Sequence, residues 1–143
     1  MGAKIKICSD NIIVITGITR SGKTLLCPIV SSLKNCEQFF FNTVVENILV
    51  MQVMKKIDFD AADHIIVKAI NEIILDRLLG RNLNTRNSDL TSINSYKNKK
   101  IYLKRANSDS NKNVHKSKEL KKNFFPIMFH EALFNLDLIE KTL

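Results

Sequence analysis

The sequence lacks any apolar run close to the roughly 20 residues that a membrane-spanning helix needs. Its first residues, MGAKIKICSDN, are too polar for the hydrophobic region of a signal peptide. The three cysteines, Cys8, Cys27 and Cys36, are odd in number and have no C-x-x-C spacing, so neither a disulfide framework nor a zinc site is indicated. We therefore expect a cytoplasmic protein with free thiols and no membrane span.

Glycine is also scarce, and two of only four glycines lie in the stretch TGITRSGKT, residues 16–24. This stretch matches the phosphate-loop pattern G-x-x-x-x-G-K-[ST] through Gly17, Gly22, Lys23 and Thr24. Glycine lets the backbone turn its N–H groups inward, and the start of a helix adds partial positive charge. The loop therefore predicts a cradle for a phosphate or sulfate group. The alternative is a glycine-containing turn that binds nothing.

The hydrophobic pattern predicts an α/β fold, with a P-loop NTPase-like parallel sheet and flanking helices in a single domain of 143 residues. Gly80 is placed to cap the longest helix, and Asp58 or Asp60 to begin it. Pro28 should shorten the first helix. The expected strands are 11–16, 37–41, 100–103 and 124–130, and the expected helices are 23–33, 43–57, 61–79 and 131–143. With so few strands the sheet is expected to be incomplete and the chain helix-rich.

The positive charge is localised between residues 97 and 122, where ten Lys and Arg residues face two acidic ones, while the rest of the chain is balanced. The segment is interleaved with Asn and Ser, and only Tyr96 and Tyr102 could stack on bases. We interpret it as a solvated and partly mobile segment within the domain. The alternative is a rim for an anionic ligand; binding of nucleic acid is not favoured.

A kinase or triphosphate hydrolase would also need a carboxylate at the end of an apolar strand to hold magnesium. The only textual match is IILD, which ends at Asp76. That segment lies within a long helical pattern, so Asp76 is interpreted as a surface residue of a helix. The sequence therefore argues against standard NTPase chemistry.

The stretch TRSGKTLL resembles the 5′-phosphosulfate-binding loop of sulfotransferases. Arg20, Ser21, Gly22 and Thr24 match the family pattern, and Lys23 replaces a threonine. The segment GRNLNTRNSDLTSI is similar to a stretch of bacterial and marine sulfotransferase-like proteins, and FFPIMFHEALFNLDLIEKTL to the strand and helix of the family that carry a catalytic histidine. The resemblance extends over nearly the whole chain and corresponds to the N-terminal portion of the family, so residues 1–143 are expected to form a truncated domain.

The resemblance implies transfer of a sulfuryl group from 3′-phosphoadenosine-5′-phosphosulfate to a hydroxyl or amine of a small molecule or glycan, with no metal required. It implies catalytic roles for Arg20, at the bridging oxygen, and for His130, as the base. The implied donor-binding residues are Gly17, Thr19, Arg20, Ser21, Gly22, Lys23, Thr24 and Leu25.

The sequence departs from the family in two places. Met128 and Phe129 precede His130 where familiar members have a lysine two residues before the histidine, so a structural role for His130 stays open. The family motif that binds the 3′-phosphate would follow Leu143, which leaves activity of this chain alone in doubt.

Three further interpretations stay open. Arg81 and Arg86 are candidates to contact an anionic acceptor or the nucleotide, or else belong to a charged loop. The runner-up function is a small P-loop kinase or NTPase that uses ATP and magnesium. The third is a basic fragment that binds nucleic acid without catalysis.

Overall fold

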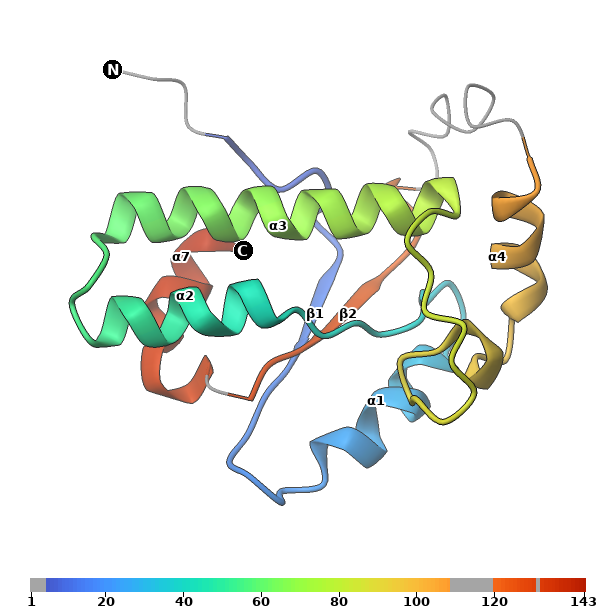
Figure 1. Cartoon of the computed structure of the whole chain (residues 1–143), viewed down its shortest axis with the longest axis horizontal. Coiled ribbons are helices and arrows are strands. Elements are labelled where there is room, and N and C mark those ends of the chain that lie inside the picture. Colours follow the sequence, from blue (N-terminus) through green and yellow to red (C-terminus); the bar gives the residue numbers. More distant parts are fainter. Residues whose placement is uncertain (1–4, 109–119, 131) are drawn as a thin grey trace.

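A computed structural model describes residues 5–108, 120–130 and 132–143 (Figure 1). These residues form a mixed α/β fold with five α-helices, two short 3-10 helices and a two-stranded parallel sheet. The elements in chain order are β1 (Ile12–Ile15), α1 (Lys23–Ser31), α2 (Thr43–Val53), α3 (Phe59–Leu79), η1 (Ile93–Ser95), α4 (Lys99–Ala106), β2 (Phe125–Met128), η2 (Ala132–Asn135) and α7 (Leu136–Thr142).

The sheet joins segments that are far apart in the sequence. In the parallel pair, Ile12 lies opposite Phe125 and Ile15 opposite Met128. The other edge of β2 pairs with residues 36–40 through two isolated parallel bridges, Cys36 with Phe124 and Phe40 with Ile127. The strand expected at 37–41 is thus present only as these bridges, whereas the strands expected at 11–16 and 124–130 are confirmed.

Side chains of β1 alternate between the two faces of the sheet, as the period of a strand requires. Ile13 and Ile15 pack with Cys27 of α1 in a small cluster, while Ile12 and Val14 pack against the main core. The main core consists of apolar residues from α2, α3, β2, η2 and α7. Helix α1 therefore covers one face of the sheet, and α2, α3 and α7 cover the other.

Helix α3 begins and ends as the sequence predicts. The Asp58 carboxylate accepts a hydrogen bond from the backbone N–H of Ala61 at 2.8 Å, and Gly80 adopts a left-handed conformation with φ 71°. The helix is the longest element, and Figure 1 shows α2 beside it with α7 and α4 toward its opposite ends. It holds these other elements in place.

The strand expected at 100–103 is wrong, because these residues belong to α4. Tyr102 and Arg105 lie three positions apart, on one side of this helix, and both are buried. The solvated description of residues 97–122 holds for Lys99, Lys100 and Lys104, which are exposed, but fails for Tyr102 and Arg105. Residues 109–119 of this basic segment lie outside the described part of the chain.

Asp76 also differs from its prediction. It lies in α3, as expected, but it is 9% exposed rather than a surface residue. Arg81 and Asn82, just beyond the helix, both contact its carboxylate. A hydrophobic pattern cannot reveal polar partners that follow the end of a helix.

None of the helices in the described part of the chain is long and apolar enough to cross a membrane. Cys8, Cys27 and Cys36 are free thiols, as expected.

Gly80 and Gly22 give a matched test of how the fold is packed, because both have a positive φ. A Cβ at Gly80 would lie 2.4 Å from the backbone nitrogen of Ala106, whereas a Cβ at Gly22 would meet nothing within 4 Å. We expect Gly22→Ala to lower the free energy of unfolding by about 1–2 kcal/mol, from backbone strain alone. Gly80→Ala should cost more than about 4 kcal/mol, because α4 must also move. Urea denaturation measures both, and equal losses would contradict the close contact between α3 and α4.

Candidate functional site

The loop at residues 16–22 connects the carboxyl end of β1 to the first turn of α1. Arg20 has φ 65° and Gly22 has φ 83°, so the loop contains two left-handed residues with one residue between them. Left-handed positions in a turn direct successive backbone N–H groups toward one point, and the N-terminus of α1 adds its partial positive charge. This backbone geometry suits an anion.

Lys23 is the most enclosed side chain of this segment, with only 6% of its surface exposed. Its Nζ donates hydrogen bonds of 3.0 Å to the carbonyl oxygens of Gly17 and Ile18. A lysine ammonium has three N–H groups, so these two bonds leave a third for a ligand. The side chain that the motif requires is thus already held against the loop.

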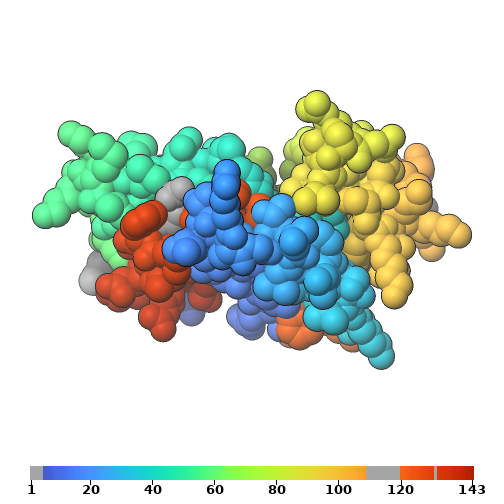
Figure 2. Space-filling model, turned by 90° about the horizontal axis from the view of Figure 1, so that it is seen from below, coloured from blue at the N-terminus to red at the C-terminus, as the bar shows by residue number. Residues whose placement is uncertain are grey.

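The remaining predicted loop side chains face solvent, where a ligand would meet them. Figure 2 shows the loop and α1 on one face of the molecule, between the C-terminal residues and the segment around residues 81–106. The exposed predicted residues are Thr19, Arg20, Ser21, Thr24 and Leu25. Within the described residues, Arg20 has no ion-pair partner.

The base of the loop is fixed by the small cluster of Ile15, Cys27, Phe39 and Met128. Burial raises the pKa of the Cys27 thiol to about 11, although the nearby positive charge of Lys23 acts in the opposite direction. The thiol is therefore protonated at neutral pH and has the role of a small apolar side chain.

His130 follows β2, and the carboxyl ends of parallel strands meet at one edge of a sheet. It therefore lies at the same edge as the loop. Its backbone N–H donates to Oε1 of Glu46 on α2 at 2.5 Å, and its Nδ1 is 3.7 Å from the same oxygen. Its ring packs against that of Phe41 in a T-shaped arrangement, with 4.9 Å between ring centroids. The 3.7 Å between Nδ1 and Oε1 is too long for a hydrogen bond, and the side chain is 39% exposed, so the imidazole is accessible to a ligand.

Glu46 was not among the residues singled out in the sequence. It is 7% exposed and lies among the buried residues of α2, which are otherwise apolar. A single acidic residue at a core position of a helix needs a polar partner, which is the signal that the sequence contained. The sequence alone does not show that this partner is His130, because His130 lies 84 positions further along the chain.

Arg81 and Arg86 have separate environments. Arg81 pairs with Asp76 at 3.0 Å and lines a cavity of about 260 Å³. Arg86 pairs with Asp89 at 3.7 Å, with 77% of its side chain exposed, and does not line that cavity. Across residues 5–108, 120–130 and 132–143, no three His, Cys, Asp or Glu side chains gather as a metal site requires.

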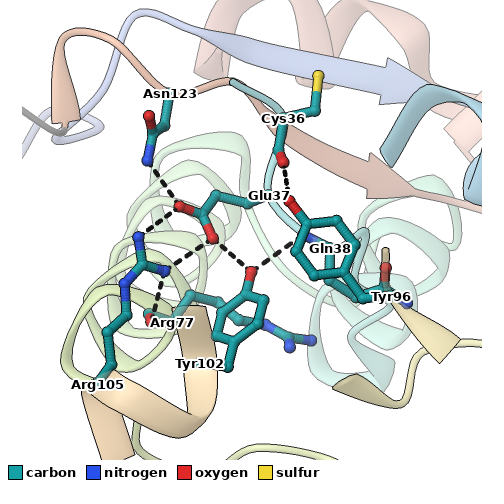
Figure 3. Close-up of polar contacts among 8 residues, drawn as sticks. All are labelled: Cys36, Glu37, Gln38, Arg77, Tyr96, Tyr102, Arg105 and Asn123. Carbon is teal, nitrogen blue, oxygen red and sulfur yellow. Dashed lines mark hydrogen bonds and ion pairs between the residues drawn. The ribbon is translucent and has the colours of Figure 1, made fainter. Parts of the chain in front are cut away.

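A buried polar network that the sequence did not predict centres on Glu37 (Figure 3). Both oxygens of Glu37 accept hydrogen bonds of 2.9 Å from the guanidinium of Arg105. The carboxylate also accepts from the hydroxyl of Tyr102 and, at 2.7 Å, from the side-chain amide of Asn123. Glu37 and Arg105 are 4% and 6% exposed, so the pair is removed from water.

The same network ties α4 and the residues just before it to the backbone of residues 36–38. The Tyr102 hydroxyl accepts from the backbone N–H of Gln38 at 3.0 Å, and the Tyr96 hydroxyl donates to the carbonyl of Cys36. The pKa of Tyr102 is raised well above its usual value. Burial is the largest cause, and the negative charge of Glu37 is the second. Because Tyr96 and Tyr102 are both buried, neither is available to stack on a base.

Comparison of the chain with protein-family models, curated proteins and solved structures found no match.

The Glu37–Arg105 pair should show strong coupling. Glu37→Gln leaves the Arg105 charge buried without its carboxylate, and we expect a loss of about 3–5 kcal/mol in the free energy of unfolding. The double variant with Arg105→Met should lose clearly less than the sum of the single variants, because it buries no charge at either position. Lys104→Met, on the exposed side of α4, is the control and should change stability by less than about 0.5 kcal/mol. Additive losses would contradict a coupled pair.

Proposed function

We propose that this chain is a sulfotransferase-like protein that binds 3′-phosphoadenosine-5′-phosphosulfate and transfers its sulfuryl group to a hydroxyl or amine. The observation that supports the proposal is that His130, whose backbone is bound by Glu46, lies at the same sheet edge as the loop that carries the exposed Arg20. Lys23, Thr24 and the loop N–H groups would hold the 5′-phosphosulfate.

The proposed chemistry needs a base and a group that stabilises the leaving phosphate. The acceptor oxygen or nitrogen forms a bond to sulfur while the bond from sulfur to the bridging oxygen breaks, which releases adenosine 3′,5′-bisphosphate. His130 takes the acceptor's proton, and Glu46 holds the backbone of His130 and places a negative charge 3.7 Å from its Nδ1. Arg20, exposed in the loop, neutralises the charge that develops on the bridging oxygen. Such a transfer depends on positioning and charge more than on covalent catalysis.

A small P-loop kinase or NTPase is the second candidate function, because Lys23 and Thr24 follow Gly22 as in nucleotide triphosphate loops. It requires a carboxylate near the loop to hold magnesium. Asp76, the textual match for that carboxylate, is instead bound to Arg81 and Asn82 at the end of α3. Among the described residues, it is the carboxylate of Glu46, and not that of Asp76, that contacts the chain just after β2, at the sheet edge where the loop lies.

Binding of the nucleotide should depend on Lys23 and not on magnesium. We expect adenosine 3′,5′-bisphosphate to bind the wild-type chain in the presence of a chelator, and Lys23→Ala to weaken binding about 10- to 150-fold, the loss of one charge-assisted hydrogen bond. Lys34→Ala, an exposed lysine beyond α1, is the matched control. Isothermal titration measures the three affinities. Binding of ATP only with magnesium would favour the kinase instead, and binding of neither nucleotide would refute both.

His130 should affect the chemical step and leave donor binding unchanged. We expect His130→Ala to lower kcat about 100- to 10,000-fold, the usual contribution of a positioned base. Glu46→Gln should lower it less, because the imidazole remains but loses the negative charge near its Nδ1. The rate of adenosine 3′,5′-bisphosphate release with a simple phenol as acceptor measures the effect, and His64→Ala, an exposed histidine of α3, is the control. An unchanged kcat in His130→Ala would remove His130 from the reaction.

A further inference from the structure

A cavity of about 260 Å³ lies where the C-terminal end of α3 meets the segment after it and the residues that lead into α2. Figure 1 shows these three parts converging between α2 and α4. Its lining combines apolar and polar side chains: Phe40, Phe41, Asn42, Ile73, Asp76, Arg77, Arg81, Asn82, Asn84 and Thr91. No part of the phosphate-type loop lines it.

The charges in this cavity do not balance. Asp76 is its one acidic lining residue, and its carboxylate is already held by Arg81 at 3.0 Å and by the side-chain amide of Asn82 at 2.6 Å. Arg77 is therefore left as an excess positive charge. The lining carries two arginines against one aspartate.

Arg77 has no acceptor for its guanidinium in the described part of the chain. The residue is 7% exposed, and its Nη1 is buried without a hydrogen-bond partner. Its guanidinium carbon lies 5.7 Å from the centre of the Tyr102 ring, and Figure 3 shows Arg105 on the other side of that ring in this view. The Glu37 carboxylate is not available to accept a hydrogen bond from Arg77. Its two oxygens already accept hydrogen bonds from Arg105, Tyr102 and Asn123.

A buried guanidinium without an acceptor is costly, and an oxyanion in the cavity would supply what is missing. The planar guanidinium presents paired donors that match the oxygens of a carboxylate, sulfate or phosphate. Asn42 caps α2 with its amide oxygen, which leaves its amide nitrogen as a further donor, and the N-terminus of α2 adds partial positive charge. Several independent features of the cavity thus favour an anion.

The size of the cavity limits what it can hold. Pockets that enclose a whole drug-sized ligand usually have roughly 300–1,000 Å³, and this cavity is smaller. It can hold one anionic group with a short part of the molecule attached, but not a complete nucleotide.

We propose that this cavity binds the oxyanion group of a small molecule, with Arg77 and Arg81 as its cationic contacts. Phe41 lines the cavity and also packs against His130, so the cavity and the histidine share one side chain. The anchored molecule would then be an anionic acceptor for the transfer. This assignment as acceptor site rests on the proposed function, whereas the anion site itself does not.

Titration of isotope-labelled protein with inorganic phosphate, and separately with acetate, tests the site by NMR. We expect saturable shifts at the backbone amides of residues 81–91 and at the Nε–H of Arg77, and the anion that binds more tightly identifies the class of oxyanion. Shifts at residues 17–24 report on the loop independently, and Lys23→Ala should remove those alone. Absence of saturable shifts at 81–91 with both anions would overturn the proposal, whatever happens at the loop.

Two arginines of the same segment supply a matched pair of variants. Arg81→Gln should weaken binding at the cavity by at least about tenfold, because it also leaves Asp76 without its cationic partner. Arg86→Gln makes the same change of charge outside the cavity and should alter the affinity by less than about twofold. Equal effects of the two variants would mean general attraction to positive charge and would overturn the site.

A third variant tests whether the negative charge of Asp76 weakens binding of the anion. Asp76→Asn keeps an oxygen for the Asn82 amide but releases Arg81 and removes the competing negative charge. We expect it to tighten binding of the anion several-fold. A side chain with only a structural role would give no gain, so unchanged or weaker binding in a folded Asp76→Asn protein would contradict the proposal.

Discussion

The buried contact between Glu37 and Arg105 is the interaction on which the arrangement of the molecule most depends. Glu37 lies on the segment that pairs with β2, whereas Arg105 lies on α4, 68 positions further along the chain. An ion pair with both partners almost fully buried is stable only with good geometry and full hydrogen bonding. Arg105, Tyr102 and Asn123 supply that hydrogen bonding, and so attach α4 to the edge of the sheet.

Two features depend on this attachment. Arg105 also donates to the carbonyl of Arg77 at 3.3 Å, and its neighbour Ala106 lies against Gly80. Helix α4 therefore holds the C-terminal end of α3 in place, together with the segment that lines the proposed anion site. The loop at residues 16–22 is supported differently, by the small cluster of Ile15, Cys27, Phe39 and Met128. The two sites can thus be disturbed separately.

Local patterns were enough to predict the elements whose signals are local. Helix α3 carries its own cap residues, Asp58 and Gly80, and the loop at 16–22 follows an apolar strand and precedes a helix. Residues 100–103 were wrongly predicted as a strand, because the helical spacing of Tyr102 and Arg105 is meaningful only once Glu37 lies opposite them. Glu46 and Arg77 were missed for the same reason: their roles come from partners, or from the lack of one, that only the folded chain determines.

The two cationic features differ in what an anion would gain from them. At the loop, the Lys23 ammonium already donates to two carbonyl oxygens, so a bound anion shares that charge with existing acceptors or replaces them. Arg77 lines the cavity, and its buried Nη1 has no acceptor in the described part of the chain, so the cost of desolvating that group is already present in the unliganded fold. An anion in the cavity would gain from an unsatisfied donor, whereas an anion at the loop would gain from the partial positive charge at the N-terminus of α1. The cavity therefore suits selective binding of a single small group, and the loop suits a larger anion with many oxygens.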